Sequence, residues 1–280
     1  MKKALIIINV TKDESMSLAK EIAAWLTKKG VDHDFLSFDG FVDNTDFTGY
    51  DFVVSLGGDG TVLYAARNAS KYGLPVFPVN LGEFGFIASV QPEEWQKELK
   101  LFLDGKSVFE KRSMLKVEVL RDGKKVYTSL SLNDAVISAE RGVSTIMLSV
   151  KRNSLPLCRH KADGLNLATP TGSTAYSAAA GGPNVSPEVE AFVLTPLNSF
   201  SLSSRPLVLS PDSKLEISVE KSRIKGICLT VDGQEPFALA YGDTICVSLN
   251  KKKAQLVAVS AEKFYNALRS KLNWSGVPHA

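Results

Sequence analysis

A carboxylate lies at the centre of a glycine-rich stretch that runs from Leu56 to Thr61 with the sequence Leu-Gly-Gly-Asp-Gly-Thr. Glycines leave room for backbone N–H groups to approach a bound phosphate, and a threonine hydroxyl adds a donor. A carboxylate repels phosphate, so Asp59 makes chemical sense there if it accepts a proton from a hydroxyl or holds a cation that bridges to phosphate. The candidates for phosphate contact are Gly57, Gly58, Gly60 and Thr61.

A structural interpretation of the same stretch is equally open. Gly-Asp-Gly suits a tight turn, and Asp59 would then cap the helix that follows it. The stretch by itself does not separate a catalytic loop from a capped turn.

Three further stretches are richer in polar residues and glycine than packing requires. They are the Asn133–Asp134 pair, Asp163-Gly164 together with residues 169–177, and Asp232-Gly233. Each also has a structural interpretation, which is a turn for the acids and a helix cap for the Thr-Gly-Ser sequence that begins at Thr171. The histidines are isolated and lack the spacing of metal ligands, so the sequence assigns no metal site.

The glycine-rich stretch follows a predicted strand and precedes a predicted helix. Residues 52–56 are apolar and β-branched, and residues 61–69 favour a helix that Gly73 ends. Further strands are predicted at 3–10, 31–38 and 76–80, and further helices at 16–29 and 92–103. This alternation predicts a Rossmann-like α/β domain, a parallel sheet covered by helices, with ligands at the carboxyl ends of its strands. Asp59 lies at one such end.

Beyond Gly105 the pattern changes from alternating elements to strands. Asp122-Gly123 joins two strand-like runs as a hairpin, and more such runs follow as far as residue 259. Only 173–180 and 261–272 favour helices. We therefore predict an α/β nucleotide-binding domain at 1–105 and a mostly antiparallel, β-sandwich-like substrate-binding domain at 106–260. The helix within 261–280 is expected to pack back on the first domain.

Composition limits the partners. The chain has 280 residues, 44% of them hydrophobic and 22% charged, with a net charge of +3, which is typical of an ordinary globular protein. We expect no nucleic-acid partner and no membrane partner, because no basic arm and no stretch of membrane-spanning length is present. Three widely spaced cysteines (Cys158, Cys228 and Cys246) favour a reducing, cytoplasmic location.

In this order, three motifs resemble those of the NAD kinases. They are Gly-Gly-Asp-Gly-Thr at 57–61, the Asn133–Asp134 pair, and Thr-Pro-Thr-Gly-Ser-Thr-Ala-Tyr at 169–176. The resemblance covers nearly the whole chain and includes residues 80–86, 231–234 and 269–272. The first motif also has relatives in lipid kinases of the diacylglycerol type and in phosphofructokinases. The third, continued by Gly-Gly-Pro at 181–183, is far more specific.

The resemblance implies an activity and a mechanism. The γ-phosphoryl group of ATP, or of another phosphoryl donor, would pass to the 2′-hydroxyl of the adenosine ribose of NAD and give NADP. Asp59 would be the general base, and Mg²⁺ would be the divalent cation. The resemblance also implies an α/β domain followed by a β-rich domain, and a homodimer or homotetramer.

The resemblance further implies which residues bind NAD. Asn133 and Asp134 would hold the adenosine, although the family normally has the longer Glu at the second position. Phe86 resembles an aromatic residue that packs on adenine, with a core role as the alternative. Asp163 resembles an acid that meets the nicotinamide side, and Asp232 resembles a second acid, with a turn role as the alternative. The other candidates for NAD contact are Asp59, Gly60, Ser173, Thr174, Ala175, Tyr176 and Ser177.

Two other functions are compatible with the first motif, namely a related lipid kinase and a non-catalytic dinucleotide sensor. The lipid kinase is disfavoured because the sequence has no amphipathic membrane segment and because residues 169–176 are present. The sensor is disfavoured because Asp59 is intact.

Overall fold

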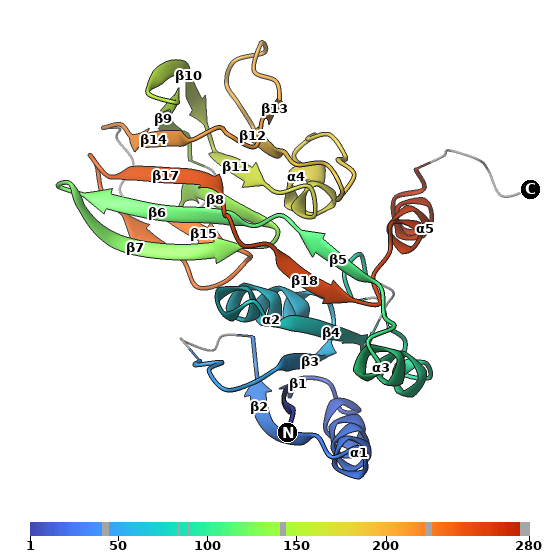
Figure 1. Cartoon of the computed structure of the whole chain (residues 1–280). Coiled ribbons are helices and arrows are strands. Elements are labelled where there is room, and N and C mark those ends of the chain that lie inside the picture. The colour runs from blue at the N-terminus through green and yellow to red at the C-terminus, as the bar shows by residue number, and fades with distance from the viewer. Residues whose placement is uncertain (41–44, 83–84, 89, 141–143, 222–225, 275–280) are drawn as a thin grey trace, which may run out of the picture. The chain divides into compact units, whose positions relative to one another are not determined.

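The computed structural model describes residues 1–40, 45–82, 85–88, 90–140, 144–221 and 226–274 (Figure 1). The chain forms two compact units, one made of Met1–Arg112 with Lys253–Ala280 and the other of Ser113–Lys252.

The first unit is built on a six-stranded sheet in the order β2-β1-β3-β4-β18-β5. Its strands are β1 (Lys3–Asn9), β2 (Asp32–Phe38), β3 (Phe52–Gly57), β4 (Pro75–Asn80), β5 (Phe109–Arg112) and β18 (Ala254–Val257). Neighbouring strands are parallel except for β5, which is antiparallel to β18. Its helices are α1 (Ser15–Lys28), α2 (Asp59–Tyr72), α3 (Trp95–Leu103) and α5 (Ala261–Leu272).

The expected domain limits at 105 and 260 move to 112 and 252. Strands β5 and β18 pair with each other, and β18 also pairs with β4, so both belong to the first sheet. The sequence did not predict this pairing, because β5 and β18 are short and more than a hundred residues apart in the chain.

Burial explains why the first sheet forms. Residues 4–8 of β1 are each at most 3% exposed, as expected for a parallel strand covered on both faces. In α1, Leu18, Ile22 and Leu26 are buried at helical spacing. Helix α2 ends at Gly73, whose φ of 72° is left-handed and is readily adopted by glycine.

The second unit contains two six-stranded antiparallel sheets, in the orders β10-β9-β14-β17-β6-β7 and β13-β12-β11-β8-β15-β16. The first comprises β6 (Leu115–Arg121), β7 (Lys124–Ser131), β9 (Ile146–Arg152), β10 (Leu155–Ala162), β14 (Leu215–Val219) and β17 (Thr244–Leu249). The second comprises β8 (Asp134–Ala139), β11 (Gly164–Ala168), β12 (Phe192–Leu197), β13 (Leu207–Leu209), β15 (Ile227–Val231) and β16 (Phe237–Leu239).

One apolar core joins these two sheets. It includes Val117 and Ile217 from one sheet and Ile137 and Leu229 from the other. The second unit is therefore a β-sandwich. A 3₁₀ helix, η1 (Gly172–Thr174), and a short helix, α4 (Tyr176–Ala179), lie between β11 and β12. The α/β first unit and the antiparallel second unit confirm the predicted fold class.

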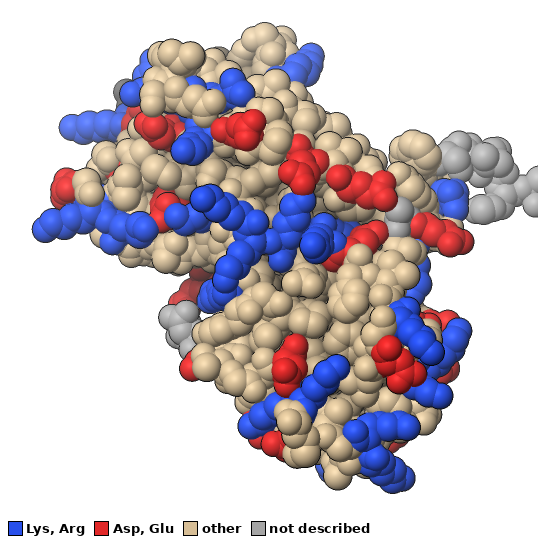
Figure 2. All heavy atoms as spheres, in the orientation of Figure 1, with Lys and Arg blue, Asp and Glu red and all other residues tan. Residues whose placement is uncertain are grey.

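The surface carries charges of both signs. On the face drawn in Figure 2, Lys and Arg are interspersed with Asp and Glu. On the β6–β7 hairpin, Lys116 and Lys125 both form ion pairs with Glu118. Within the described part of the chain, every helix is too short or too polar to cross a membrane.

Candidate active site

The glycine-rich stretch connects β3 to α2 at the carboxyl edge of the first sheet. Gly57 ends β3, Gly58 is the N-cap residue and Asp59 begins α2. The strand register pairs Gly57 with Asn80 at the end of β4. The first N–H groups of a helix have no partner inside it, and this helix end carries a partial positive charge. The edge can therefore receive an anion.

Two glycines at this edge are required by packing. A Cβ on Gly57 would lie 2.2 Å from Thr61 Oγ1, and a Cβ on Gly85 would lie 2.0 Å from Asp59 Oδ1. Any larger residue at either position would displace the turn or the carboxylate.

Gly58 and Gly60 differ from these two. A Cβ on either would meet nothing within 4 Å, and neither residue has a positive φ. Packing and backbone conformation therefore leave both positions open to other residues. Because these two glycines carry no side chain to cover their backbone at the helix N-terminus, a ligand can approach their N–H groups.

The hydroxyl of Thr61 is directed into the protein. Thr61 is 1% exposed, and Asn9 Nδ2 at the end of β1 donates a hydrogen bond to its Oγ1 at 3.1 Å. Asn9 Oδ1 in turn accepts hydrogen bonds from the backbone N–H and hydroxyl of Thr11, at 3.0 and 2.7 Å. Thr61 thus ties the turn to β1, a role that the sequence did not suggest.

Three consecutive backbone N–H groups hold the carboxylate of Asp59. Phe86 donates to Oδ2 at 2.9 Å, while Ile87 and Ala88 donate to Oδ1 at 3.2 and 2.9 Å. Asp59 is only partly buried. Its orientation is thus fixed by the protein, and Oδ2, with one hydrogen bond, has the greater remaining capacity to accept another.

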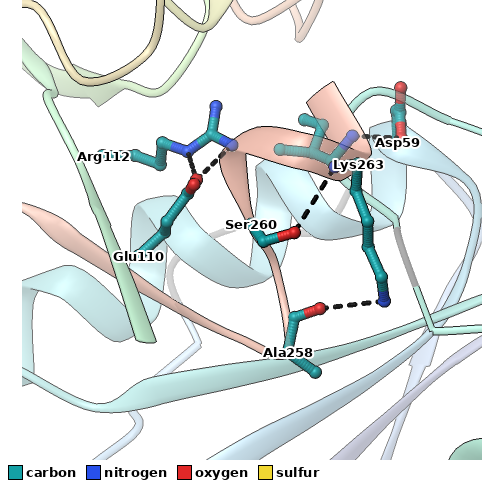
Figure 3. Close-up of polar contacts among 7 residues, drawn as sticks. Asp59, Glu110, Arg112, Ala258, Ser260 and Lys263 are labelled. Atoms are coloured by element: carbon teal, nitrogen blue, oxygen red, sulfur yellow. Dashed lines mark hydrogen bonds and ion pairs between the residues drawn. The ribbon is translucent and has the colours of Figure 1, made fainter. Parts of the chain in front are cut away.

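Phe86 connects this carboxylate to the C-terminal helix. Its ring packs against that of Phe264 in α5, with the centroids 6.1 Å apart. The start of α5 is fixed locally, because Ser260 Oγ accepts the N–H of Lys263 at 3.4 Å and Lys263 Nζ donates to the carbonyl of Ala258 at 3.0 Å (Figure 3). The structure thus supplies a packing partner for Phe86. Residues 83 and 84 of the resembling stretch lie outside the described residues.

A pocket of ≈ 280 Å³ opens at the same edge of the sheet. It is lined by the segment between β1 and α1 and by the residues after β4, namely Thr11, Lys12, Asp13, Glu14, Leu81 and Gly82. Sequence reasoning did not single out these residues. Asp59 was predicted because ligands bind at the carboxyl ends of parallel strands. The same rule applies to residues 11–14, because they follow the parallel strand β1.

The second unit brings Asn133, Asp134 and Asp232 together. Asp134 begins β8 and Asp232 follows β15, and these two strands are neighbours. Asp134 and Asp232 are 6% and 5% exposed. Asp134 Oδ2 accepts a hydrogen bond from Asn166 Nδ2 of β11 at 3.2 Å. Two acids therefore share one buried polar cluster.

This arrangement changes the acidity of Asp134. Burial disfavours its charged form, and the negative charge of Asp232 acts in the same direction, so the pKa of Asp134 rises to about 7 despite the hydrogen bond from Asn166. Around neutral pH, Asp134 can therefore donate a hydrogen bond as a carboxylic acid or accept one as a carboxylate.

Asn133 contacts the polar segment that follows β11. Its carbonyl accepts the N–H of Thr169 at 2.8 Å, and the hydroxyl of Thr169 donates to the carbonyl of Leu132 at 2.5 Å. A Cβ on Gly172 would lie 2.1 Å from the Asn133 carbonyl oxygen. Gly172 thus permits the close approach that joins the two predicted motifs.

The candidates at 173–177 divide by exposure. Ser173 and Ser177 are fully buried, and their hydroxyls bond to Val185 and Thr195 within the unit. Tyr176 is 51% exposed. Thr174 and Ala175 are partly buried. The structure thus gives the two serines internal hydrogen bonds and leaves Tyr176 accessible.

Asp163 lies away from this group. In the register of β11 with β8, Ala168 is opposite Asp134, whereas Asp163 precedes the far end of β11. Ala168 lies five positions after Asp163 along an extended strand, so their Cα atoms are roughly 16 Å apart. Asp163 Oδ2 accepts a hydrogen bond from Asn198 at 3.0 Å.

Comparison with solved structures identifies the class of fold. The chain superposes on yeast NADH kinase complexed with NADH with a TM-score of 0.86 at 23% identity, covering 100% of this chain and 89% of that one. It superposes on an NAD kinase from Archaeoglobus fulgidus in complex with ATP with a TM-score of 0.76 at 25% identity, covering 95% and 96%. The fold is that of the NAD(H) kinases.

Sequence comparison identifies the family. Models described as the ATP-NAD kinase N-terminal and C-terminal domains match residues 39–107 and 132–259. The chain is 44% identical over 277 residues to an NAD kinase of Treponema denticola, covering 99% of this chain and 98% of that protein. It is 41% identical over 275 residues to an NAD kinase of Treponema pallidum (strain Nichols), covering 98% and 90%. The chain belongs to the ATP-NAD kinase family.

Replacing Gly60 by alanine should leave the protein at least as stable as the wild type. Alanine is favoured over glycine in a helix by up to about 1 kcal/mol, and the added Cβ has open space. Gly57→Ala is the matched control, because its Cβ meets Thr61 and should destabilise by roughly 1–3 kcal/mol. Urea unfolding measures both. A clear loss of stability in Gly60→Ala would show that folding requires this glycine.

Asp134 should make stability depend on pH in a defined direction. Between the unfolded pKa of 3.8 and the folded pKa of about 7, the native state binds a proton that the unfolded chain has released. The wild-type free energy of unfolding therefore falls as pH rises, by at most about 1.4 kcal/mol per pH unit. Asp134→Asn has no carboxyl group that takes up this proton, so its stability relative to the wild type should increase from pH 4 to pH 7. A relative stability that is constant with pH would contradict the raised pKa.

Proposed function

We propose that this chain is an NAD kinase, a phosphotransferase with an alcohol group as acceptor. It transfers the γ-phosphoryl group of ATP to the 2′-hydroxyl of the adenosine ribose of NAD and produces NADP. The observation that carries the proposal is the carboxylate of Asp59, held at a glycine-rich helix N-terminus in a chain that belongs to the ATP-NAD kinase family.

Asp59 is the general base in this proposal. Its Oδ2 accepts the proton of the ribose 2′-hydroxyl as the oxygen attacks the γ-phosphorus, and the leaving group is ADP. A carboxylate is a weak base, so most of the rate enhancement comes from positioning the reactants and stabilising the transferring phosphoryl group. The N–H groups of residues 86–88 support this role because they fix the carboxylate before the substrate arrives.

The donor phosphates would lie against the open backbone of Gly58 and Gly60. Both N–H groups are at the start of α2, where helix dipole and free donors favour an anion. Gly60→Ala should accordingly raise the KM for ATP while stability is kept. In this proposal Thr61 has a structural role, because its Oγ1 accepts a hydrogen bond from Asn9.

Mg²⁺ would enter bound to ATP. Among the described residues, no three His, Cys, Asp or Glu side chains lie together as a metal cage. Kinases commonly hold Mg²⁺ through substrate phosphates and one or two carboxylates. When bound, the ion neutralises charge on the phosphates, and Asp59 is the carboxylate of the glycine-rich turn that could meet it.

NAD would be bound chiefly by the cluster of the second unit. Asn133 and Asp134 are proposed to hold the adenosine, with Thr174, Ala175 and Tyr176 beside them and Phe86 packing on adenine. The accessibility of Tyr176 and the contact of Gly172 with Asn133 support this assignment. Asp163 would meet the nicotinamide side, and its distance along β11 makes it the weakest member of the set.

The protein is proposed to act as a homodimer or homotetramer in a reducing, cytoplasmic setting. The cysteines are free thiols. Exposed apolar side chains lie along β10, an edge strand, and in the nearby loop, where Phe200 N–H donates to the Lys161 carbonyl at 2.9 Å. Phe200 is 76% and Leu202 is 90% exposed, which supports a contact with a second copy.

Asp59→Asn should lower turnover by several orders of magnitude and leave the Kd for NAD within a few fold of the wild type. The amide keeps the shape of the side chain but accepts a proton far less readily. Turnover is measured as NADP formation from NAD, ATP and saturating Mg²⁺, and NAD binding by calorimetry. A large loss of affinity with little change in turnover would assign Asp59 to binding instead.

The wild-type protein separates the alternative functions in the same assays. Absence of NADP formation with any phosphoryl donor would overturn the proposal. Phosphorylation of a diacylglycerol or sphingoid base without NAD turnover would identify a lipid kinase. Tight NAD binding without turnover would identify a sensor.

A further inference from the structure

The carboxylate of Asp232 is surrounded by donors from one short segment. Its Oδ1 accepts hydrogen bonds from Ser131 Oγ at 2.6 Å and from the N–H groups of Asn133 and Asp134 at 2.8 and 3.2 Å. Its Oδ2 accepts the N–H of Leu132 at 2.9 Å. Three donors thus meet Oδ1 and one meets Oδ2, and Asp232 is 5% exposed.

The backbone around Asp232 is arranged for this contact. Asp232 has a φ of 49°, a left-handed conformation that aspartate and asparagine tolerate better than most residues. Its N–H donates to the carbonyl of Asp134 at 2.9 Å. The turn after β15 thus points a carboxylate at the segment that leads into β8.

The segment held in this way carries the side chains proposed to bind NAD. The N–H of Asn133 is taken by Asp232 and its carbonyl by Thr169. Asn133 Oδ1 is buried and, among the described residues, has no hydrogen-bond partner. A buried acceptor without a donor is costly unless a ligand supplies one.

We propose that Asp232 is a positioning residue of the dinucleotide site: it folds residues 131–134 into the loop that presents Asn133 and Asp134, and it does not itself contact the ligand. Its second effect is electrostatic. Burial is the largest cause of the raised pKa of Asp134 and the charge of Asp232 is the second, so Asp232 extends the pH range in which Asp134 can donate a hydrogen bond. This inference rests on the proposed function only in identifying the ligand as a dinucleotide.

Asp232→Asn tests the proposal with the smallest change of shape. Asparagine tolerates the left-handed backbone, but one acceptor oxygen becomes an NH₂ group that faces N–H donors. Amide hydrogen exchange at Leu132, Asn133 and Asp134 should accelerate at least tenfold relative to the amides of β11. The Kd for NAD should rise at least tenfold, while turnover at saturating NAD changes only a few fold.

The pH profile gives a readout that simple loss of packing would not move. Without the charge at position 232, the pKa of Asp134 should fall, because one cause of its elevation is removed. The pH range over which the free energy of unfolding declines should therefore end at a lower pH in Asp232→Asn than in the wild type.

Asp243→Asn is the matched control for general destabilisation. Asp243 is also a buried acid of the second unit, 1% exposed, but its carboxylate bonds to Arg121 and to the N–H of Ala240. Its variant should lower stability without a selective change in the exchange of residues 132–134.

Two outcomes would overturn the proposal. Loss of NAD affinity with wild-type exchange at residues 132–134 would show that Asp232 contacts the ligand directly. Faster exchange at those residues with unchanged NAD affinity would show a purely structural role. The exchange experiment needs no ligand, so failure of the wild type to bind NAD would overturn the proposed function and leave the loop-folding test intact.

Discussion

A carboxylate removed from water needs hydrogen-bond donors, and backbone N–H groups supply most of those that hold Asp59 and Asp232. Asp59 receives three such groups from residues 86–88, and Asp232 receives three from residues 132–134. In both cases a single side chain accepts hydrogen bonds from three consecutive backbone amides. Each acid therefore shapes a loop at the end of a sheet, and each loop carries the groups proposed to meet substrate.

The two carboxylates, both held by backbone N–H groups, differ in how accessible they are. Asp59 is partly exposed and Oδ2 accepts one hydrogen bond, so a hydroxyl group can still reach it. Asp232 is buried and accepts four hydrogen bonds from residues 131–134, three at Oδ1 and one at Oδ2, which suits an acid that supports a loop. Similar hydrogen bonding thus leaves the acid of the first unit accessible for its proposed role as proton acceptor, whereas the buried acid of the second unit supports a loop.

The sequence predicted the position of Asp59 well because local chemistry decides the structure there. The apolar run before Gly57 and the helix formers after Gly60 place Asp59 at a strand-to-helix turn without reference to any distant residue. Helix 261–272 was predicted with its observed limits because its apolar positions repeat at helical spacing. Residues 173–180 were less predictable, since Ala175, with φ and ψ of −98° and −129°, separates a 3₁₀ turn from a four-residue helix.

What the sequence could not predict depends on partners far along the chain. The amides that hold Asp59 are 27 to 29 residues away, and backbone N–H groups leave no mark in side-chain identity. The contacts of Asp232 span about a hundred residues, from 98 to 101. Asn166 did leave a signal, as a polar residue within a buried strand, and its bond to Asp134 explains it.

The aspartate at position 134 is shorter than the acid expected there, and its length matches the contact that it makes with Asn166. The resemblance to the family leads one to expect Glu there, and Asp134 is one methylene shorter. Its carboxylate already bonds to Asn166 and is 6% exposed, so an added methylene would have to displace Asn166 or extend away from it. The cluster of Asp134, Asn166 and Asp232 is therefore adjusted to the aspartate, and Asn133, with its unpartnered Oδ1, is the group of this loop that is open to a ligand donor.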